Sequence, residues 1–199
     1  MKKQIILASA SPRRQELLKS LGISFKVVPS NLKELQMDGE VPARAAVRLA
    51  QAKALAVARR FPKAVVLAAD TIVLLGKEVL GKPKSLAEAG RMIEKLSGRT
   101  HLVITGFCLI KPDDNRVIKK AVFTKVKMKR VSRAELKGYL RSGEPLDKAG
   151  AYAVQEILHG LSPAGWPWQP RRRRPELDRA AAFQIVYPPI HRESQRSSR

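Results

Sequence analysis

Residues 65–75 read VVLAADTIVLL, two apolar runs broken by a single acidic residue, Asp70. The first run predicts a short buried strand that ends at Asp70, and residues 71–75 are apolar again. A carboxylate between apolar runs is costly to bury unless it binds a cation or a hydrogen-bond partner. Because α/β sheets bind ligands at the carboxyl ends of their strands, this position indicates a functional aspartate. An ordinary turn aspartate is the alternative that Asp70 alone leaves open.

Strands and helices are predicted to alternate on the N-terminal side of this stretch. Short strands are expected over 4–8 and 25–28. Between them, a helix is predicted from Ser11, the N-cap, with Pro12 in the first turn, to Gly22. A longer helix is predicted from Pro42 to about Arg60.

The C-terminal side continues the same alternation. Gly76, Lys77 and Glu78 form a plausible tight turn. Capping-box patterns, serine followed three residues later by glutamate, open one helix at Ser85 and another at Ser132. Strands over 101–110 and about 121–131 lie between the two helices. Helices mixed with strands in this order predict an α/β fold with a mixed sheet.

Composition narrows the function further. The chain has 199 residues, a size that fits one domain, and a net charge of +22, which favours polyanionic partners such as phosphorylated small molecules or nucleic acid. The basic residues are dispersed and aromatic residues are few, so a nucleotide enzyme is favoured over a nucleic-acid-binding module.

The single cysteine, Cys108, is expected to be buried and inert. No apolar run could span a membrane, and the apolar start is too short for a signal peptide, so a cytoplasmic location is expected.

The composition changes after Glu156. Residues 157–199 contain both tryptophans and the arginine run 171–174, and they show no sustained helical or strand period. We therefore expect a folded domain over 1–156 and a basic, poorly ordered tail over 157–199.

Basic and hydroxyl side chains mark three further segments. Lys53 projects from the apolar side of the long helix, where it either extends from the edge of the core to solvent or points into a phosphate site. Ser9, Arg13 and Arg14 surround a predicted helix N-terminus, which favours anions, although for this segment alone capping with a solvated basic face is the better explanation. Two lysines stand in turn-forming loops and are weak signals alone: Lys82 and Lys148.

Taken together, these segments resemble the Maf family of nucleoside triphosphate pyrophosphatases. The matching stretches follow the family order and cover most of residues 4–156: LASASPRRQELL (7–18), AADTIV (68–73), LGKP (80–83), LSGRTH (96–101), TGF (105–107) and EPLDKAGAYAVQ (144–155). The motifs ADT, GRTH and DKAGAY with a following glutamine look like the branch that acts on dTTP and UTP.

The resemblance implies a role for each matching residue. Asp70 would be the proton acceptor, and a divalent metal, Mg²⁺ or Mn²⁺, would be held by Glu34 and Asp70. The residues that would set the base preference are Arg13, Thr71 and Gln155. The residues that would line the triphosphate are Ser9, Arg14, Lys53, Lys82 and Lys148.

The resemblance also implies the architecture and the reaction. The expected fold is a mixed α/β sheet in two lobes with a central cleft, like that of the Maf and inosine-triphosphatase proteins, commonly paired as a homodimer. The expected reaction converts a nucleoside triphosphate and water into the monophosphate and pyrophosphate.

The C-terminus departs from the family pattern. Family members continue after Gln155 with a strand, a segment like NVVGLP and a closing helix, and residues 157–199 match none of these. Such a change is typical of a shifted reading frame. Two alternatives to the enzyme therefore stay open at this point: a nucleic-acid-binding module that uses the 171–174 run, and an inactive remnant of the enzyme fold.

Overall fold

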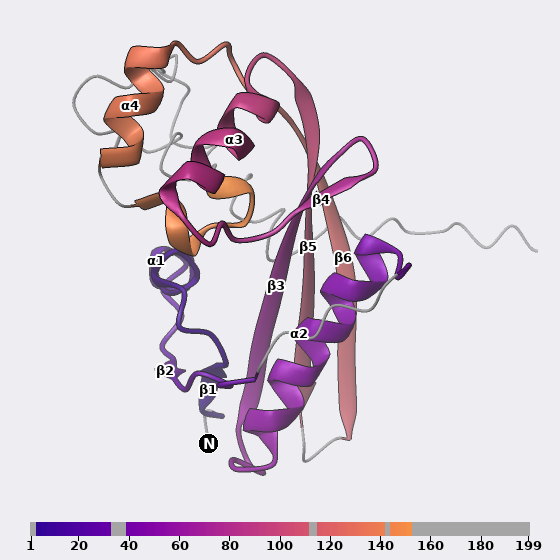
Figure 1. Ribbon diagram of the computed structural model, residues 1–199. Coiled ribbons are helices and arrows are strands. Elements are labelled where there is room, and N and C mark those ends of the chain that lie inside the picture. The colour runs from indigo at the N-terminus through magenta and orange to yellow at the C-terminus, as the bar shows by residue number, and fades with distance from the viewer. Residues whose placement is uncertain (1–2, 33–38, 112–114, 142–143, 153–199) are drawn as a thin grey trace, which may run out of the picture.

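The computed structural model describes residues 3–32, 39–111, 115–141 and 144–152. Within these residues, six strands form a mixed sheet in the order β2-β1-β3-β5-β6, with β4 paired to β3, and four α-helices lie against it (Figure 1). This confirms the predicted α/β fold. The strands are β1 (Ile5–Leu7), β2 (Lys26–Val27), β3 (Val65–Leu75), β4 (Glu78–Leu80), β5 (Thr100–Lys111) and β6 (Arg116–Lys127). The helices are α1 (Pro12–Ser20), α2 (Pro42–Ala58), α3 (Leu86–Leu96) and α4 (Arg133–Arg141), with 3-10 helices η2 (Glu144–Asp147) and η3 (Ala149–Ala151).

The local start and stop signals of the helices are confirmed in position, although the Ser11 side chain forms no cap hydrogen bond at the start of α1. Gly22 follows α1 with a φ of +68°, a left-handed conformation that glycine adopts without strain. The Ser85 hydroxyl accepts a hydrogen bond from the Glu88 amide (3.2 Å), and Ser132 exchanges two such bonds with Glu135. These reciprocal bonds satisfy amides at the start of α4 that would otherwise lack partners.

Two strand predictions were wrong in their extents. β3 runs without interruption through Asp70, so Asp70 lies inside a strand and not at its carboxyl end. The strand predicted over 121–131 is β6, which begins and ends earlier, at Arg116 and Lys127. In both cases β5 decides the extent, because it pairs antiparallel with β3 over 66–74 and with β6 along its whole length. The predicted tail over 157–199 lies outside the described residues.

The described residues pack into two apolar cores, which fits the expected two lobes. In the first, α2 crosses one face of the sheet over β3 and β5 (Figure 1). Small residues allow this close packing, among them Ala50 and Ala54 of α2 and Ala68 of β3. The second core joins α3, α4 and η3 to the far end of β3.

Cys108 is fully buried in the first core, where burial raises the pKa of its thiol, as expected for an inert cysteine. Among the described residues, no helix has the length and apolar character needed to cross a membrane.

A buried histidine–tyrosine contact ties η3 to the start of β5. The Nε2 atom of His101 forms a hydrogen bond with the Tyr152 hydroxyl, and the two rings meet edge to face with centroids 5.4 Å apart. Both residues are buried, and the Tyr139 hydroxyl donates to the Ala151 carbonyl oxygen (3.0 Å) next to them. Burial lowers the pKa of His101 and raises that of Tyr152.

We expect this contact to make stability depend on pH. Because the pKa of His101 is lower in the folded chain than in the unfolded chain, the unfolded state takes up the proton first. The contribution of His101 is therefore complete above the unfolded value of about 6.5, and it is lost as the pH falls through the lower folded value. Urea unfolding at several pH values between 7.5 and 5.5 measures this loss. The His101→Gln variant should show a flatter profile, and an identical slope in both proteins would contradict the assignment.

Candidate active site

An open stretch of one strand edge defines the site. β1 pairs with residues 65–67 of β3, and β4 pairs with residues 73–75 on the same edge, because β5 occupies the opposite one. Residues 68–72 of β3 therefore have no described strand beside them on this edge. A cleft of about 1810 Å³ lies here, with Asp70 at the middle of the open stretch.

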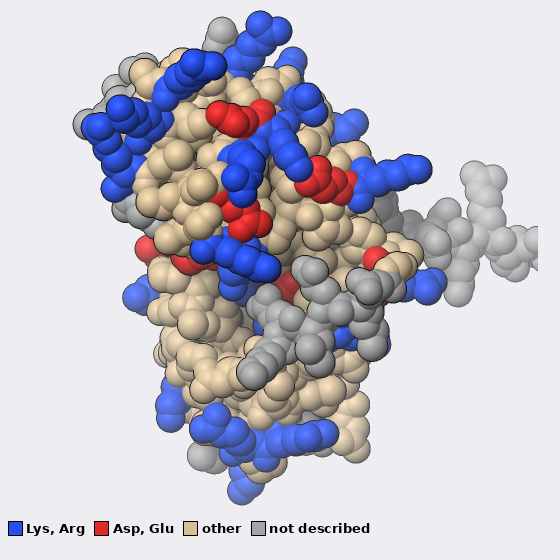
Figure 2. All heavy atoms as spheres, viewed as in Figure 1, with Lys and Arg blue, Asp and Glu red and all other residues tan. Residues whose placement is uncertain are grey.

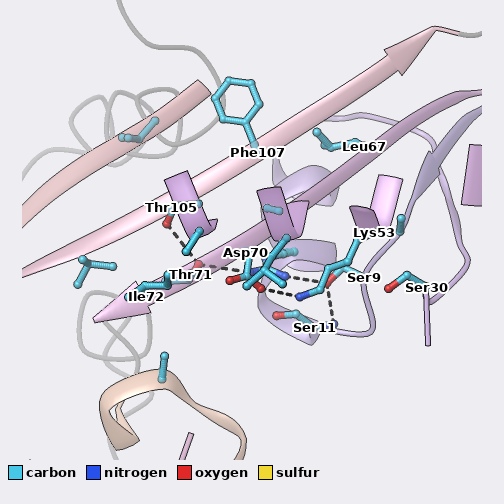
Figure 3. A pocket seen from close by; sticks show the side chains of 18 of the residues that line it. Ser9, Ser11, Ser30, Lys53, Leu67, Asp70, Thr71, Ile72, Thr105 and Phe107 are labelled. Atoms are coloured by element: carbon cyan, nitrogen blue, oxygen red, sulfur yellow. Dashed lines mark hydrogen bonds and ion pairs between the residues drawn. The ribbon is translucent and has the colours of Figure 1, made fainter. Parts of the chain in front are cut away.

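Lys53 and Asp70 form a buried ion pair in this cleft. The Nζ atom of Lys53, on α2, lies 2.5 Å from Oδ1 of Asp70 (Figure 3). Their exposed fractions are 9 % and 6 %, so both charges are largely withdrawn from water. Lys53 thus does not extend to solvent from the edge of the core. Its ammonium instead offsets the cost of burying the carboxylate that interrupts the apolar strand.

On the other face of β3, a chain of hydrogen bonds links three elements. Arg14 of α1 donates through Nη1 to the Ser9 hydroxyl (3.0 Å) and through Nη2 to the Thr71 hydroxyl (3.3 Å). The Thr71 hydroxyl in turn lies 3.3 Å from that of Thr105, on β5 (Figure 3). Ser9 also accepts a bond from the Ser11 amide, and Arg13 lines the same cleft. The N-terminus of α1, which carries Arg14, therefore meets Thr71 of β3 at one site.

The far wall of the cleft comes from the loop after β4 and from η2 and η3. Lys82 lines the cleft, and the Gly150 amide donates to the Gly81 carbonyl oxygen (2.9 Å), which holds η3 against this loop. Lys148 is 4 % exposed and pairs with Asp147 at 3.3 Å. Asp147 lines the cleft, and Lys148 is buried next to it in the chain, so the expected contact of Lys148 with the triphosphate stays a prediction.

Comparison with known proteins identifies the relatives of this arrangement. The model of the family described as "Maf-like protein" matches residues 4–162. The chain belongs to the Maf family. It is 49 % identical to a dTTP/UTP pyrophosphatase of Geotalea uraniireducens over 77 % of this chain and 79 % of the relative. Proteins of the same name from Symbiobacterium thermophilum and Aquifex aeolicus are 48 % and 45 % identical, over 76 % and 79 % of this chain and 77 % and 85 % of theirs.

Most of the residues singled out in the sequence come together in this Maf chain. Of the residues singled out in the sequence, seven line the cleft: Ser9, Arg13, Arg14, Lys53, Asp70, Thr71 and Lys82. Glu34 and Gln155 lie outside the described residues, so their expected roles stay predictions.

Sequence reasoning missed one ion pair of the Maf cleft. Arg48, on α2, was not singled out in the sequence, yet its Nε and Nη2 atoms donate to both carboxylate oxygens of Glu40 at 2.7–3.1 Å. Both residues line the cleft, and the guanidinium lowers the pKa of Glu40. The helical period alone could not reveal this pair, because Glu40 precedes α2 and lies outside its period.

The described residues of the Maf cleft fit a divalent metal whose remaining ligands are oxygens of a bound substrate. No group of three or more His, Cys, Asp or Glu side chains among the described residues could hold a metal ion. Mg²⁺ commonly binds through one or two carboxylates together with substrate phosphates. Asp70 supplies one carboxylate, whereas both oxygens of Glu40 are engaged by Arg48.

Proposed function

We propose that this chain hydrolyses nucleoside triphosphates, foremost dTTP and UTP, to the monophosphate and pyrophosphate. The observation that carries the proposal is the buried Lys53–Asp70 pair at the open edge of β3, inside a cleft that also presents Arg13, Arg14 and Lys82. Relatives that are 45–49 % identical over most of their length bear the name dTTP/UTP pyrophosphatase. A carboxylate among cations suits water-driven cleavage of a phosphoanhydride.

The cations of the cleft would hold the triphosphate. Lys53 and Lys82 provide compact point charges, and Arg14 presents a planar guanidinium already oriented by Ser9 and Thr71. Such fixed charges stabilise the negative charge that develops on phosphate oxygens during transfer. Lys148, buried beside the cleft, would support the wall and contribute to the same positive field.

Asp70 would act on the attacking water. The water oxygen forms a bond to the α-phosphorus, the bond from the α-phosphorus to the bridging oxygen breaks, and pyrophosphate leaves. The Asp70 carboxylate accepts the proton that the water loses. Lys53 would hold the carboxylate toward the cleft, since its ammonium contacts Oδ1.

We include a divalent metal, Mg²⁺ or Mn²⁺, in the proposal. When bound by Asp70 and Glu34 together with phosphate oxygens, it would neutralise charge on the substrate. Arg13, Thr71 and Gln155 are proposed to set the base preference, and Arg13 and Thr71 line the cleft. The homodimer implied by the family resemblance and the cytoplasmic location expected from the sequence both stay predictions.

The nucleic-acid-binding alternative is not favoured. On the visible face of the molecule, Lys and Arg form separate groups with Asp and Glu between them (Figure 2). A dedicated nucleic-acid surface instead concentrates basic residues in a patch or stripe. The alternative of an inactive remnant is not favoured by the described site residues. An inactive remnant would be expected to lack an assembled site, whereas one cleft is lined by Lys53, Asp70 and Thr71.

A substrate panel tests the proposal. Purified chain is incubated with dTTP, UTP, CTP and 7-methyl-GTP, with Mg²⁺, with Mn²⁺ and with a chelator, and pyrophosphate release is measured. We expect dTTP and UTP to be cleaved fastest and the chelator to suppress all release. Absence of release from every nucleotide would contradict the proposal. Salt-sensitive RNA binding without hydrolysis would favour the nucleic-acid module instead.

A further inference from the structure

We propose that Thr105 is a positioning residue that makes the Thr71 hydroxyl a hydrogen-bond donor, so that the cleft selects a base carbonyl over a base amino group. The inference rests on the proposed function, because it concerns how the same cleft distinguishes pyrimidine bases. Neither the resemblance nor the geometry described above gives Thr105 a role in recognition.

The placement of Thr105 is set by the sheet. Thr71 and Thr105 are directly opposite each other in the antiparallel pairing of β3 with β5. Side chains at opposed positions lie on the same face with Cβ atoms about 4.5–5.5 Å apart. Here the two hydroxyl oxygens are 3.3 Å apart, both residues are half-buried, and both line the cleft.

The hydrogen-bond inventory of Thr71 gives the chemical argument. A hydroxyl has one hydrogen to donate and two lone pairs to accept with, whereas a guanidinium only donates. Arg14 therefore occupies one lone pair of the Thr71 oxygen. The geometry of the Thr71–Thr105 contact allows either hydroxyl to donate. In the proposed arrangement Thr105 donates to the second lone pair, so Thr71 retains only its own hydrogen for a ligand.

A hydroxyl that can only donate discriminates between pyrimidines. Thymine and uracil carry a carbonyl oxygen at position 4, which accepts, while cytosine carries an amino group there, which donates. A donor set against the cytosine amino group leaves both groups unpaired, and unpaired buried polar groups are costly. The pair would thus favour dTTP and UTP over cytosine nucleotides.

The Thr105→Val variant tests this assignment, since it keeps the β-branched shape and removes the hydroxyl. The measured quantity is the ratio of kcat/KM for dTTP to kcat/KM for dCTP. Dissociation constants for both nucleotides, measured without divalent metal, provide a readout that is independent of turnover. We expect the dTTP preference to fall by about 3- to 10-fold in both measurements, and the change to appear in KM more than in kcat.

Two further variants separate recognition from packing. Thr105→Ser retains the hydroxyl and should restore the preference. Thr100→Val makes the same chemical change at an exposed position of β5, opposite Lys127 and apart from the residues that line the cleft, and should leave the preference unchanged. A purely structural role for Thr105 would lower the rates with both nucleotides equally, together with the melting temperature.

The outcomes distinguish this inference from the proposed function. Hydrolysis of dTTP with the same preference in wild type and Thr105→Val overturns the inference and leaves the function standing. Preferential dTTP binding without hydrolysis, lost in Thr105→Val, supports the inference and contradicts the function. A wild-type chain that binds neither nucleotide overturns both.

Discussion

Replacement of Asp70 by asparagine is expected to reduce pyrophosphate release from dTTP by at least about 10²–10⁴-fold, the range of general-base contributions. Asparagine has nearly the same shape but cannot accept the proton of the attacking water. The loss should appear in kcat, because the cations that would bind the triphosphate remain. Initial rates at saturating dTTP and metal measure it.

The same substitution has a second, structural effect that must be separated from the first. Lys53 would remain 9 % exposed without its carboxylate, and breaking a buried pair by removing one partner costs about 3–5 kcal/mol. The double variant Asp70→Asn with Lys53→Met removes both charges. It should recover most of the unfolding free energy in urea titrations and none of the activity. Recovery of activity along with stability, or an active Asp70→Asn enzyme, would contradict the proposed role of Asp70.

The second large effect is expected at Gly106, which lies directly opposite Asp70 in the pairing of β3 with β5. A Cβ atom there would lie 2.3 Å from the Ala46 carbonyl carbon, 2.4 Å from its oxygen and 2.5 Å from the Val47 amide nitrogen. All three are backbone atoms of α2, so no side-chain rotation relieves the overlap. Gly106→Ala should therefore push the helix away from the sheet and destabilise the chain by about 1–3 kcal/mol or more.

Activity should fall together with stability in Gly106→Ala. α2 carries Lys53, and a displacement of about 1 Å at a reacting group can cost about 10²-fold in rate. Gly138→Ala, in α4, is the matched control because a Cβ there meets nothing within 4 Å. That control should gain about 0.5–1 kcal/mol in urea unfolding and keep its activity. A Gly106→Ala chain that is as stable and active as the control would contradict the close approach of α2.

The cleft residues could be named from the sequence only in part. Lys53 and Asp70 stood out because a charged group among apolar residues calls for a partner, and Arg14 stood out because it lies at a predicted helix N-terminus. Their partners could not be derived from spacing. Arg48 was not singled out at all, because its bond to Glu40 depends on how the chain enters α2. Thr105 was quoted only within the stretch TGF (105–107), and no role in the site was derived for it, because a threonine in an apolar strand is ordinary.

Sequence alone determined the features that act within one turn or one strand. The proline start of α1, its glycine end, the serine cap at Ser85 and the capping box at Ser132 were all predicted correctly, because caps satisfy backbone groups a few residues away. Only the tertiary structure decided where Asp70 lies. It sits inside β3 rather than at its end because the pairing with β5 continues past it.

The site itself also belongs to the tertiary structure. Its contacts join residues that are 17 positions apart for Lys53 and Asp70, 34 for Thr71 and Thr105, and 57 for Arg14 and Thr71. Local propensities do not act over such separations. The gap between β1 and β4 on one edge of β3 brings these side chains together, and that gap exists only once the sheet has assembled.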